Sequence, residues 1–420
     1  MRILLLTTYF RPESAANAVL MTQLAEELTE QGHQVTVITA MPHYDKNRIW
    51  DEYRGRLWMR ERRGEINIHR VYIYVPPHKT SLAGRLLNYA SFNLLSTLAG
   101  LMAGKHDVLL VPSPPLTNGV FGFLISRLRG MPFIYNVQDL YPDVAVRLGI
   151  LKNPRVIHFF EAMERFVYRK AAGVSVISDD MRRNLMGKGV PEDKLVIIPN
   201  FVDTEFVKPL PRKNCFSQEQ QFDDKFVALF AGNVGLSQGL EIVIEAAERL
   251  KAIPDLLFAI VGDGSAKAGL VAEAEKRGLH NIRFLPWQPY ERVPELYSAA
   301  DVCLATLRRG ITEDSVPSKL YTIMGVARPI LASLDSSSDT WRMIEQAGSG
   351  LCVEPEDAKA LAEAVLTLYN DREKAAELGR RGRAFVEAHH TQQRVAQQYQ
   401  EFFARILAQR GKPVPTNAKV

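Results

Sequence analysis

Cysteine is scarce in this chain of 420 residues, which contains only Cys215, Cys303 and Cys352. The three lie far apart and form no Cys-x-x-Cys pair, so the sequence suggests neither a disulfide framework nor a zinc site. A reducing compartment is therefore expected. The start, MRILLLTTYFRPE, has a short apolar run and no small-residue cleavage site, which indicates a buried strand rather than a signal peptide.

A strong charge of one sign is also missing. The formal net charge of +5 permits an anionic partner but does not identify one. The sequence contains no aromatic RNA-binding motif, helix-turn-helix signal or paired cysteine-histidine set, so nucleic acid is not expected as a partner.

Long uninterrupted hydrophobic runs are missing as well. The segment LAGRLLNYASFNLLSTLAGLMAG, residues 82–104, has about the length of a membrane span, but Arg85, Asn88 and Asn93 interrupt it. It predicts a mostly buried helix, with a membrane-facing surface near a lipid acceptor as the alternative. In residues 45–63 basic residues outnumber acidic ones around two tryptophans, which fits a solvated surface or peripheral membrane contact.

Apolar strand-like runs alternate with helical patterns in two series. The first has strands at 2–10, 34–40, 107–113 and 132–137, with helices at 15–31 and 118–128. The second has strands at 226–232, 256–262, 282–287, 301–307 and 328–333, with helices at 241–251, 266–278 and 293–299. This alternation predicts an α/β protein with two Rossmann-like domains, each built on a doubly wound parallel sheet.

The two series set the domain boundaries. We expect a first domain over residues 1–200, a linker rich in proline and polar residues over 201–224, and a second domain over 225–390. In doubly wound sheets ligands bind beyond the carboxyl ends of the strands, so the loops at those ends are the candidate sites.

Three strand-end loops of the first domain carry polar side chains. They hold Glu13, Ser14 and Asn17; His43 and Tyr44; and Gln138 and Asp139. The amides and side chains there can bind a hydroxyl or a phosphate. Ordinary helix capping and a structural histidine remain the alternative explanations.

Four strand-end loops of the second domain suit a phosphorylated ligand. They hold Asn233, Gly235 and Gln238; Gly262 and Gly264; Trp287, Gln288 and Tyr290; and Glu313, Asp314, Pro317, Ser318, Lys319 and Thr322. The glycines of GNVGLSQG do not have the dinucleotide spacing, but they allow amides to approach a diphosphate closely. A lysine at a helix start suits a phosphate, while the acids can bind sugar hydroxyls; a capped helix with solvated charges is the alternative.

At these residues the chain resembles the retaining family 4 glycosyltransferases of the GT-B fold, in the bacterial surface-polysaccharide branch that contains fucosamine transferases and colanic-acid-type enzymes. The motifs that carry the resemblance occur in order as YFRPE, MPHYD, SPPL, QDLYPD, IPNFVD, AGNVGLSQGLE, FLPWQPY and VPSKLYTIM. The resemblance implies two Rossmann-like domains facing an interdomain cleft and a C-terminal helix, residues 391–410, that packs back on the first domain. It also implies a nucleotide-sugar donor in the second domain, an acceptor in the first, and no required metal or other cofactor. The lack of an Asp-x-Asp motif after a strand agrees with the last point.

Three positions depart from the broader family. Its Arg and Lys in the glycine turn are Asn233 and Gln238 here, and its two spaced glutamates are Asp314 and Thr322. A His-Asp pair after the fifth strand is replaced by Gln138 and Asp139. Lys319 is therefore expected to carry more of the phosphate role.

The expected function is transfer of an N-acetylated amino sugar or related hexose, with retention, from a UDP-sugar to a lipid-linked saccharide in O-antigen, capsule or exopolysaccharide synthesis. The expected catalytic residues are Asp139, Glu313, Asp314 and Lys319. The expected location is cytoplasmic, peripheral on the inner face of the cytoplasmic membrane. A nucleotide-sugar epimerase or hydrolase, or a noncatalytic nucleotide-sugar-binding subunit, remains as an alternative.

Overall fold

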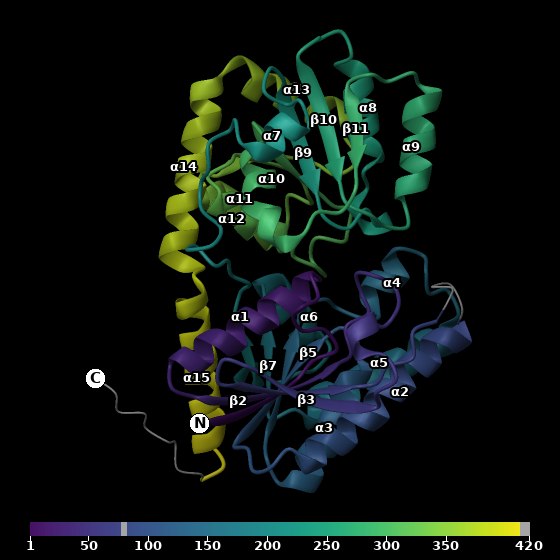
Figure 1. Cartoon of the computed structure of the whole chain (residues 1–420), viewed down its shortest axis with the longest axis vertical. Coiled ribbons are helices and arrows are strands. Elements are labelled where there is room, and N and C mark those ends of the chain that lie inside the picture. The colour runs from purple at the N-terminus through teal and green to yellow at the C-terminus, as the bar shows by residue number, and fades with distance from the viewer. Residues whose placement is uncertain (77–81, 412–420) are drawn as a thin grey trace. The chain divides into compact units, whose positions relative to one another are not determined.

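The computed structural model describes residues 1–76 and 82–411, which form two units, shown in Figure 1. The first unit comprises Met1–Val146, Leu151–Pro199 and the chain from Gln392 onward. The second comprises Arg147–Ile150 and Asn200–Thr391. Residues 201–224, assigned to a linker from the sequence, thus group with the second unit.

The first unit is built on an eight-stranded sheet in the order β3-β4-β2-β1-β5-β6-β7-β8. Neighbouring strands run parallel except β3, which is antiparallel to β4 at the edge. The strands are β1 (Arg2–Leu6), β2 (Gln34–Ala40), β3 (Trp58–Arg63), β4 (Ile66–Val71), β5 (Val108–Ser113), β6 (Phe133–Val137), β7 (Gly173–Val176) and β8 (Leu195–Ile197).

Helices cover this sheet. They are α1 (Ala16–Glu30), η1 (Asp51–Tyr53), α2 (Leu82–Met102), α3 (Thr117–Arg129), α4 (Asp143–Arg147), α5 (Pro154–Lys170), α6 (Asp179–Gly187), η2 (Glu192–Lys194) and α15 (Gln392–Ala408). Helix α15 packs beside α1, and α3 packs against both α2 and α5 (Figure 1). The last residue of α4, Arg147, groups with the second unit.

The second unit has a six-stranded parallel sheet in the order β11-β10-β9-β12-β13-β14. Its strands are β9 (Phe226–Ala231), β10 (Leu256–Val261), β11 (Ile282–Leu285), β12 (Val302–Thr306), β13 (Ile330–Ser333) and β14 (Gly350–Val353). The chain winds outward in one direction from β9 and then in the other, so the topological switch point, where such sheets bind ligands, lies between β9 and β12.

The helices of the second unit lie on both faces of this sheet. They are α7 (Cys215–Glu219), η3 (Leu236–Gln238), α8 (Glu241–Arg249), α9 (Lys267–Lys276), η4 (Tyr290–Arg292), α10 (Val293–Ser298), α11 (Lys319–Gly325), α12 (Asp339–Ala347), α13 (Ala358–Asn370) and α14 (Arg372–His389). The predicted alternation of parallel strands and helices in two doubly wound sheets is confirmed.

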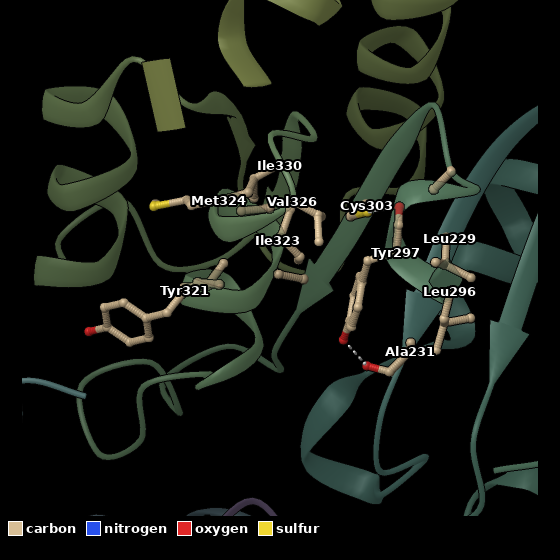
Figure 2. Packing of buried hydrophobic residues seen from close by; sticks show 14 of the residues in the cluster. Leu229, Ala231, Leu296, Tyr297, Cys303, Tyr321, Ile323, Met324, Val326 and Ile330 are labelled. Atoms are coloured by element: carbon tan, nitrogen blue, oxygen red, sulfur yellow. Dashed lines mark hydrogen bonds between the residues drawn. The ribbon is translucent and has the colours of Figure 1, made fainter. Parts of the chain in front are cut away.

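The central strand β9 is buried on both sides, because every one of its residues is apolar. Leu229 and Ala231 belong to one hydrophobic cluster, whereas Ala228 and Phe230 belong to another. Successive side chains of a strand point to opposite faces, so the two clusters are the layers between the sheet and its helices. Part of the first layer is shown in Figure 2.

The C-terminal helix α15 closes the first unit through one apolar stripe. Its buried residues include Val395, Tyr399, Phe402 and Ile406, at the three- and four-residue spacing of a helix face. A Cβ added to Gly173 of β7 would lie 2.5 Å from Cζ of Phe402 and 3.0 Å from Cδ1 of Ile406. Glycine at 173 therefore allows α15 to approach the sheet closely.

We expect Gly173→Ala to destabilise the protein by about 1–3 kcal/mol, because the added methyl group overpacks the contact with α15. Chemical unfolding followed by circular dichroism measures the change. The matched control is Gly187→Ala at the end of α6, where a Cβ would have no neighbour within 4 Å. Equal stability of the two variants would contradict this account of the contact.

Candidate functional site

The loops that follow β9 and β10 touch each other through their backbones. A Cβ on Gly262 would lie 1.9 Å from the carbonyl oxygen of Gly232, and a Cβ on Gly264 would lie 2.3 Å from that of Val234. Gly232 and Gly262 have φ values of 136° and 146°, which favour glycine. Two of the predicted loops are thus brought together, and glycine is required for their contact.

The rest of the glycine turn is tied to the end of β12. The Thr306 hydroxyl donates to the carbonyl oxygen of Gln238 at 2.6 Å. Arg308 donates its backbone N–H to the carbonyl oxygen of Ser237 at 2.9 Å and its Nε to that of Leu236 at 2.7 Å. Within the turn, the Asn233 amide group lies 2.8 Å from the position of a Cβ on Gly235. Turn and strand end therefore form one hydrogen-bonded structure.

The sequence reasoning missed two basic residues beside these loops. Arg308 carries a cation next to the turn, where its guanidinium also pairs with Glu241 at 2.6 Å. Lys267, at the start of α9, donates to the carbonyl oxygens of Gly262 at 2.7 Å and Leu285 at 3.1 Å. The available signal was that Arg308 closely follows β12 and that Lys267 begins the helix after β10.

Lys319, the first residue of α11, points to the glycine turn. Its Nζ lies 3.4 Å from the centroid of the Phe230 ring and 3.4 Å from Oε1 of Gln238. A Cβ on Gly232 would lie 3.3 Å from Nζ. Burial lowers the pKa of the Lys319 ammonium to about 7.

No carboxylate of the described residues forms an ion pair with this ammonium. Its neighbours are an aromatic ring, a glycine backbone and a neutral amide, and Ser318 at the helix start makes no side-chain cap. A desolvated cation without an internal counter-ion is suited to binding an anion from outside the chain. The capped helix with solvated charges, which was the alternative, does not describe Lys319.

The two acids before α11 differ in their surroundings. Asp314 is fully buried, and its carboxylate lies 2.7 Å from Nε of Arg147, which belongs to the same unit. Glu313 is partly exposed, and its carboxylate accepts a hydrogen bond from the Ser337 hydroxyl at 3.4 Å. Glu313 is therefore the more accessible of the two for a ligand's hydroxyl groups.

The remaining predicted donor residues lie near the ends of β11 and α11. Tyr290 stacks on Phe206 with ring centroids 4.9 Å apart, Trp287 is 42% exposed, and Gln288 donates to the carbonyl oxygen of Pro286 at 3.1 Å. Pro317 and Ser318 directly precede α11, and Thr322 lies one turn into it, partly exposed.

In the first unit, the carboxylate of Glu13 joins two of the predicted loops. Its Oε1 accepts the backbone N–H groups of His43 at 2.7 Å and Tyr44 at 2.6 Å. Alongside, Ser14 donates its backbone N–H and hydroxyl to Asp45 at 3.0 and 2.7 Å. Helix capping does not explain these residues, because α1 begins after Ala15 without a side-chain cap.

The surroundings of Glu13 make its ionised form unfavourable. Burial raises the pKa of its carboxyl to about 7, although the hydrogen bonds from His43 and Tyr44 favour the charged form. Its second oxygen, Oε2, is buried and has no hydrogen-bond partner among the described residues. Tyr9 stacks on His43 with centroids 5.6 Å apart and meets Tyr44 edge-on at 5.3 Å, so its ring packs against the loop that Glu13 binds.

The other predicted residues of the first unit lie at separate strand and helix ends. Asn17 is the second residue of α1, and its Oδ1 is buried without a hydrogen-bond partner among the described residues. Gln138 donates to Oδ1 of Asn136 at 2.8 Å, and Asp139 beside it is partly exposed. Asp143, at the end of this loop, is bound by Lys188 at 2.9 Å, which fixes the loop to α6.

We expect Glu13→Gln to change the pH dependence of stability. The folded pKa of about 7 exceeds the ordinary 4.5, so the folded state binds more protons between these values and wild-type stability falls as pH rises through them. Because the variant has no carboxyl group at this position, its free energy of unfolding should rise relative to that of the wild type by on the order of 3 kcal/mol between pH 4.5 and 8. Urea unfolding at both pH values measures this difference, and Glu30→Gln, at an exposed residue, is the control. If the free energies of unfolding of Glu13→Gln and the wild type change in parallel with pH, the raised pKa of Glu13 is contradicted.

Comparisons with known proteins agree with this architecture. Residues 18–200 match the family model described as glycosyl transferase 4-like domain, and residues 211–385 match that described as glycosyl transferases group 1. WcaI of Escherichia coli K12, whose name assigns it to colanic acid biosynthesis as a glycosyl transferase, is 32% identical over 375 residues, covering 87% of this chain and 91% of WcaI.

Solved structures show the same fold. Sucrose-phosphate synthase of Thermosynechococcus elongatus matches with a TM-score of 0.76 at 17% identity, over 97% of this chain and 100% of that one. HepE of Anabaena, solved in complex with UDP-glucose, matches with a TM-score of 0.71 at 17% identity, over 96% and 100% of the two chains. The predicted GT-B fold and family membership are confirmed, and the chain belongs to the glycosyltransferases with a 4-like N-terminal domain and a group 1 C-terminal domain.

Proposed function

We propose that this glycosyltransferase moves a sugar, an N-acetylated amino sugar or related hexose, from a UDP-sugar to a lipid-linked saccharide during synthesis of a bacterial cell-surface polysaccharide. The observation that carries the donor assignment is the desolvated Lys319 ammonium, which lies next to the Gly232 turn and pairs with no carboxylate in the described part of the chain. The UDP-glucose complex of HepE and the colanic acid assignment in the name of WcaI support the donor and the pathway class.

The proposed reaction retains the anomeric configuration. The bond between the anomeric carbon and the diphosphate oxygen breaks, and the acceptor oxygen bonds to that carbon from the same face. The acceptor's proton passes to the leaving diphosphate. Lys319 and the amides of the glycine turn stabilise the negative charge that develops on the diphosphate, because preorganised donors act strongly where water is excluded.

The other predicted residues receive roles that fit their positions. Glu313 and Asp314 position the donor sugar, Asp314 from its ion pair with Arg147. Asp139 and the loops joined by Glu13 hold the acceptor's hydroxyl groups. The positive charges of the chain itself would neutralise the diphosphate, so we propose that the reaction needs no metal and proceeds in the presence of EDTA.

The acceptor's lipid suggests a membrane contact, and α2 offers a surface for it. Leu94, Leu98 and Met102 on α2 are 60%, 54% and 63% exposed, and Leu128 on the adjacent α3 is 60% exposed. The sequence predicted a mostly buried α2, but this apolar face of the helix is exposed. Neither α2 nor α3 contains an acidic residue, and Arg127 of α3 is exposed. None of the helices in the described part of the chain has the length and hydropathy for crossing a membrane. On the basis of the exposed apolar side chains and of Arg127, we propose peripheral binding of this surface to anionic lipid at the inner face of the cytoplasmic membrane.

We expect Lys319→Met to lower turnover with a UDP-sugar and a lipid-linked acceptor by about 100-fold or more, because the main charge facing the diphosphate is lost. Stability at pH 7 should be maintained or raised. Burial lowers the pKa of Lys319 from 10.5 to about 7 in the folded state, so protonation of this lysine destabilises the folded wild type. The wild type regains this stability only as pH rises from about 7 to 10.5.

Acceptor-dependent release of UDP, together with urea unfolding, measures both effects. Lys276→Met on the exposed face of α9 is the matched control and should change neither. Near-normal turnover of Lys319→Met would overturn the donor assignment. Release of UDP with water alone, independent of any acceptor, would instead indicate a hydrolase.

We expect the wild type to sediment with vesicles of phosphatidylglycerol and phosphatidylethanolamine, and the double variant Leu94→Gln, Leu98→Gln to bind at least about tenfold more weakly. Met186→Gln, at an exposed apolar residue of α6, is the control and should bind as the wild type does. Unchanged binding of the double variant would show that α2 is not the contact surface.

A further inference from the structure

The end of β9 extends past its pairing with β12. Strand β9 pairs with β10 along its whole length, from Phe226 to Ala231, but with β12 only at Ala228 and Leu229. The two strands therefore separate at their carboxyl ends. This separation lies at the topological switch point of the sheet, next to the glycine turn.

The carbonyl group of Ala231 faces the side on which β12 has left the ladder. The next residue, Gly232, donates its N–H to the carbonyl oxygen of Val261 on β10 at 2.9 Å. Backbone groups of successive strand residues point to opposite neighbours, so the Ala231 carbonyl points away from β10. On that side Ala231 lies beyond the residues of β9 that pair with β12.

Tyr297 supplies a hydrogen-bond donor at this position. This buried residue of α10 donates its hydroxyl to the carbonyl oxygen of Ala231 at 3.1 Å, as Figure 2 shows. Because its ring is packed in the same hydrophobic cluster as Leu229 and Ala231, the hydroxyl has a fixed position. A side chain from a helix thus donates a hydrogen bond to the end of the central strand.

Both residues that flank Ala231 surround the Lys319 ammonium. The ring of Phe230, before it, lies 3.4 Å from Nζ, and a Cβ on Gly232, after it, would lie 3.3 Å from Nζ. A shift of Ala231 would move the ring and the turn together. The surroundings of the ammonium thus depend on how firmly this strand end is held.

We propose that Tyr297 is a positioning residue of the donor site, whose hydroxyl replaces β12 at the end of β9 and so fixes the Gly232 turn against Lys319. The inference rests on the proposed function in one respect, that Lys319 binds the donor diphosphate. The positioning itself is a property of the unliganded protein and can be measured without a substrate.

Loss of the hydroxyl should change the titration of Lys319. The groups that face the ammonium among the described residues are neutral, namely the Phe230 ring, the Gly232 backbone and the Gln238 amide, so burial is the cause of its lowered pKa. In Tyr297→Phe the buried Ala231 carbonyl lacks its partner, and the strand end can move to admit water. Hydration of the ammonium raises its pKa from about 7 towards the ordinary 10.5.

The experiment compares Tyr297→Phe with Tyr369→Phe. The Tyr369 hydroxyl donates to Oδ1 of Asp255 at 2.7 Å, next to the start of β10 and at the opposite edge of the same sheet. Each variant removes one tyrosine hydroxyl that makes one hydrogen bond. We would follow Lys319 by NMR in protein labelled at lysine ¹³Cε, with Lys319→Arg to assign its signal, and measure kcat and KM for the UDP-sugar across pH.

For Tyr297→Phe we expect an upward shift of the Lys319 pKa by about one unit or more, and a fall in kcat/KM on the order of tenfold at pH 7. The fall of kcat/KM at basic pH should shift to higher pH, because a Lys319 with a raised pKa stays protonated up to a higher pH. Tyr369→Phe should leave the pKa, the pH of this fall and kcat/KM as in the wild type. Replacement of Tyr297 with p-aminophenylalanine, which retains an N–H donor, should restore the wild-type values.

An unchanged Lys319 titration in Tyr297→Phe, or equal effects of the two tyrosine variants, would overturn the inference. If Tyr297→Phe does not fold, the variant with p-aminophenylalanine at 297 is the test. A wild-type pKa of Lys319 in that variant supports the role of Tyr297 as hydrogen-bond donor, and a shifted pKa contradicts it. A shifted titration combined with normal turnover of Lys319→Met would reject the proposed function and leave the positioning role intact.

Discussion

The second unit depends on one close approach, that of the Gly232 and Gly262 backbones at the carboxyl edge of its sheet. No side chain fits between them, since a Cβ on Gly262 would lie 1.9 Å from the Gly232 carbonyl oxygen. This contact sets the path of the glycine turn after β9. The glycine turn forms one side of the space that the Lys319 ammonium occupies. Backbone amides and a cation are thereby gathered where the sheet reverses its direction of winding, which suits a diphosphate.

The two units share a second property, an ionisable group that is desolvated at a cost to stability, although Glu13 is buried and Lys319 is partly exposed. Burial moves the pKa of Lys319 down and that of Glu13 up, both to about 7, so each group disfavours its charged form in the folded protein. Among the described residues Lys319 forms no ion pair of the kind that Asp314 makes with Arg147, and the positive charge of Arg70 only partly offsets the effect of burial on Glu13. Strongly shifted pKa values cluster at functional sites, and this is the physical reason for our proposal of donor chemistry at Lys319 and acceptor chemistry at Glu13.

Apolar runs and their spacing sufficed to predict the fold, because a parallel strand covered on both faces must be apolar along its whole length, as β9 is. They did not reveal the antiparallel edge strand β3, whose sequence WMRERR is mostly charged. The prediction that α2 is mostly buried was wrong for its outer face, since periodicity alone does not show whether an apolar stripe has a partner. The candidate loops were predicted from their position after strands, but Arg308 and Lys267 were missed because surface arginines and lysines are common.

The sequence by itself determined the two doubly wound sheets, the glycine turn and the identity of the basic residue that follows the last predicted loop. The tertiary structure alone decided that Lys319 forms no ion pair with any residue that the structure describes, that Glu13 joins the loops at 13–14 and 43–45, and that Tyr297 donates a hydrogen bond to the end of β9. The physical reason is that strand and helix formation follow from local patterns of apolar residues, whereas desolvation and hydrogen-bond partners depend on groups that are distant in the chain and meet only when it folds.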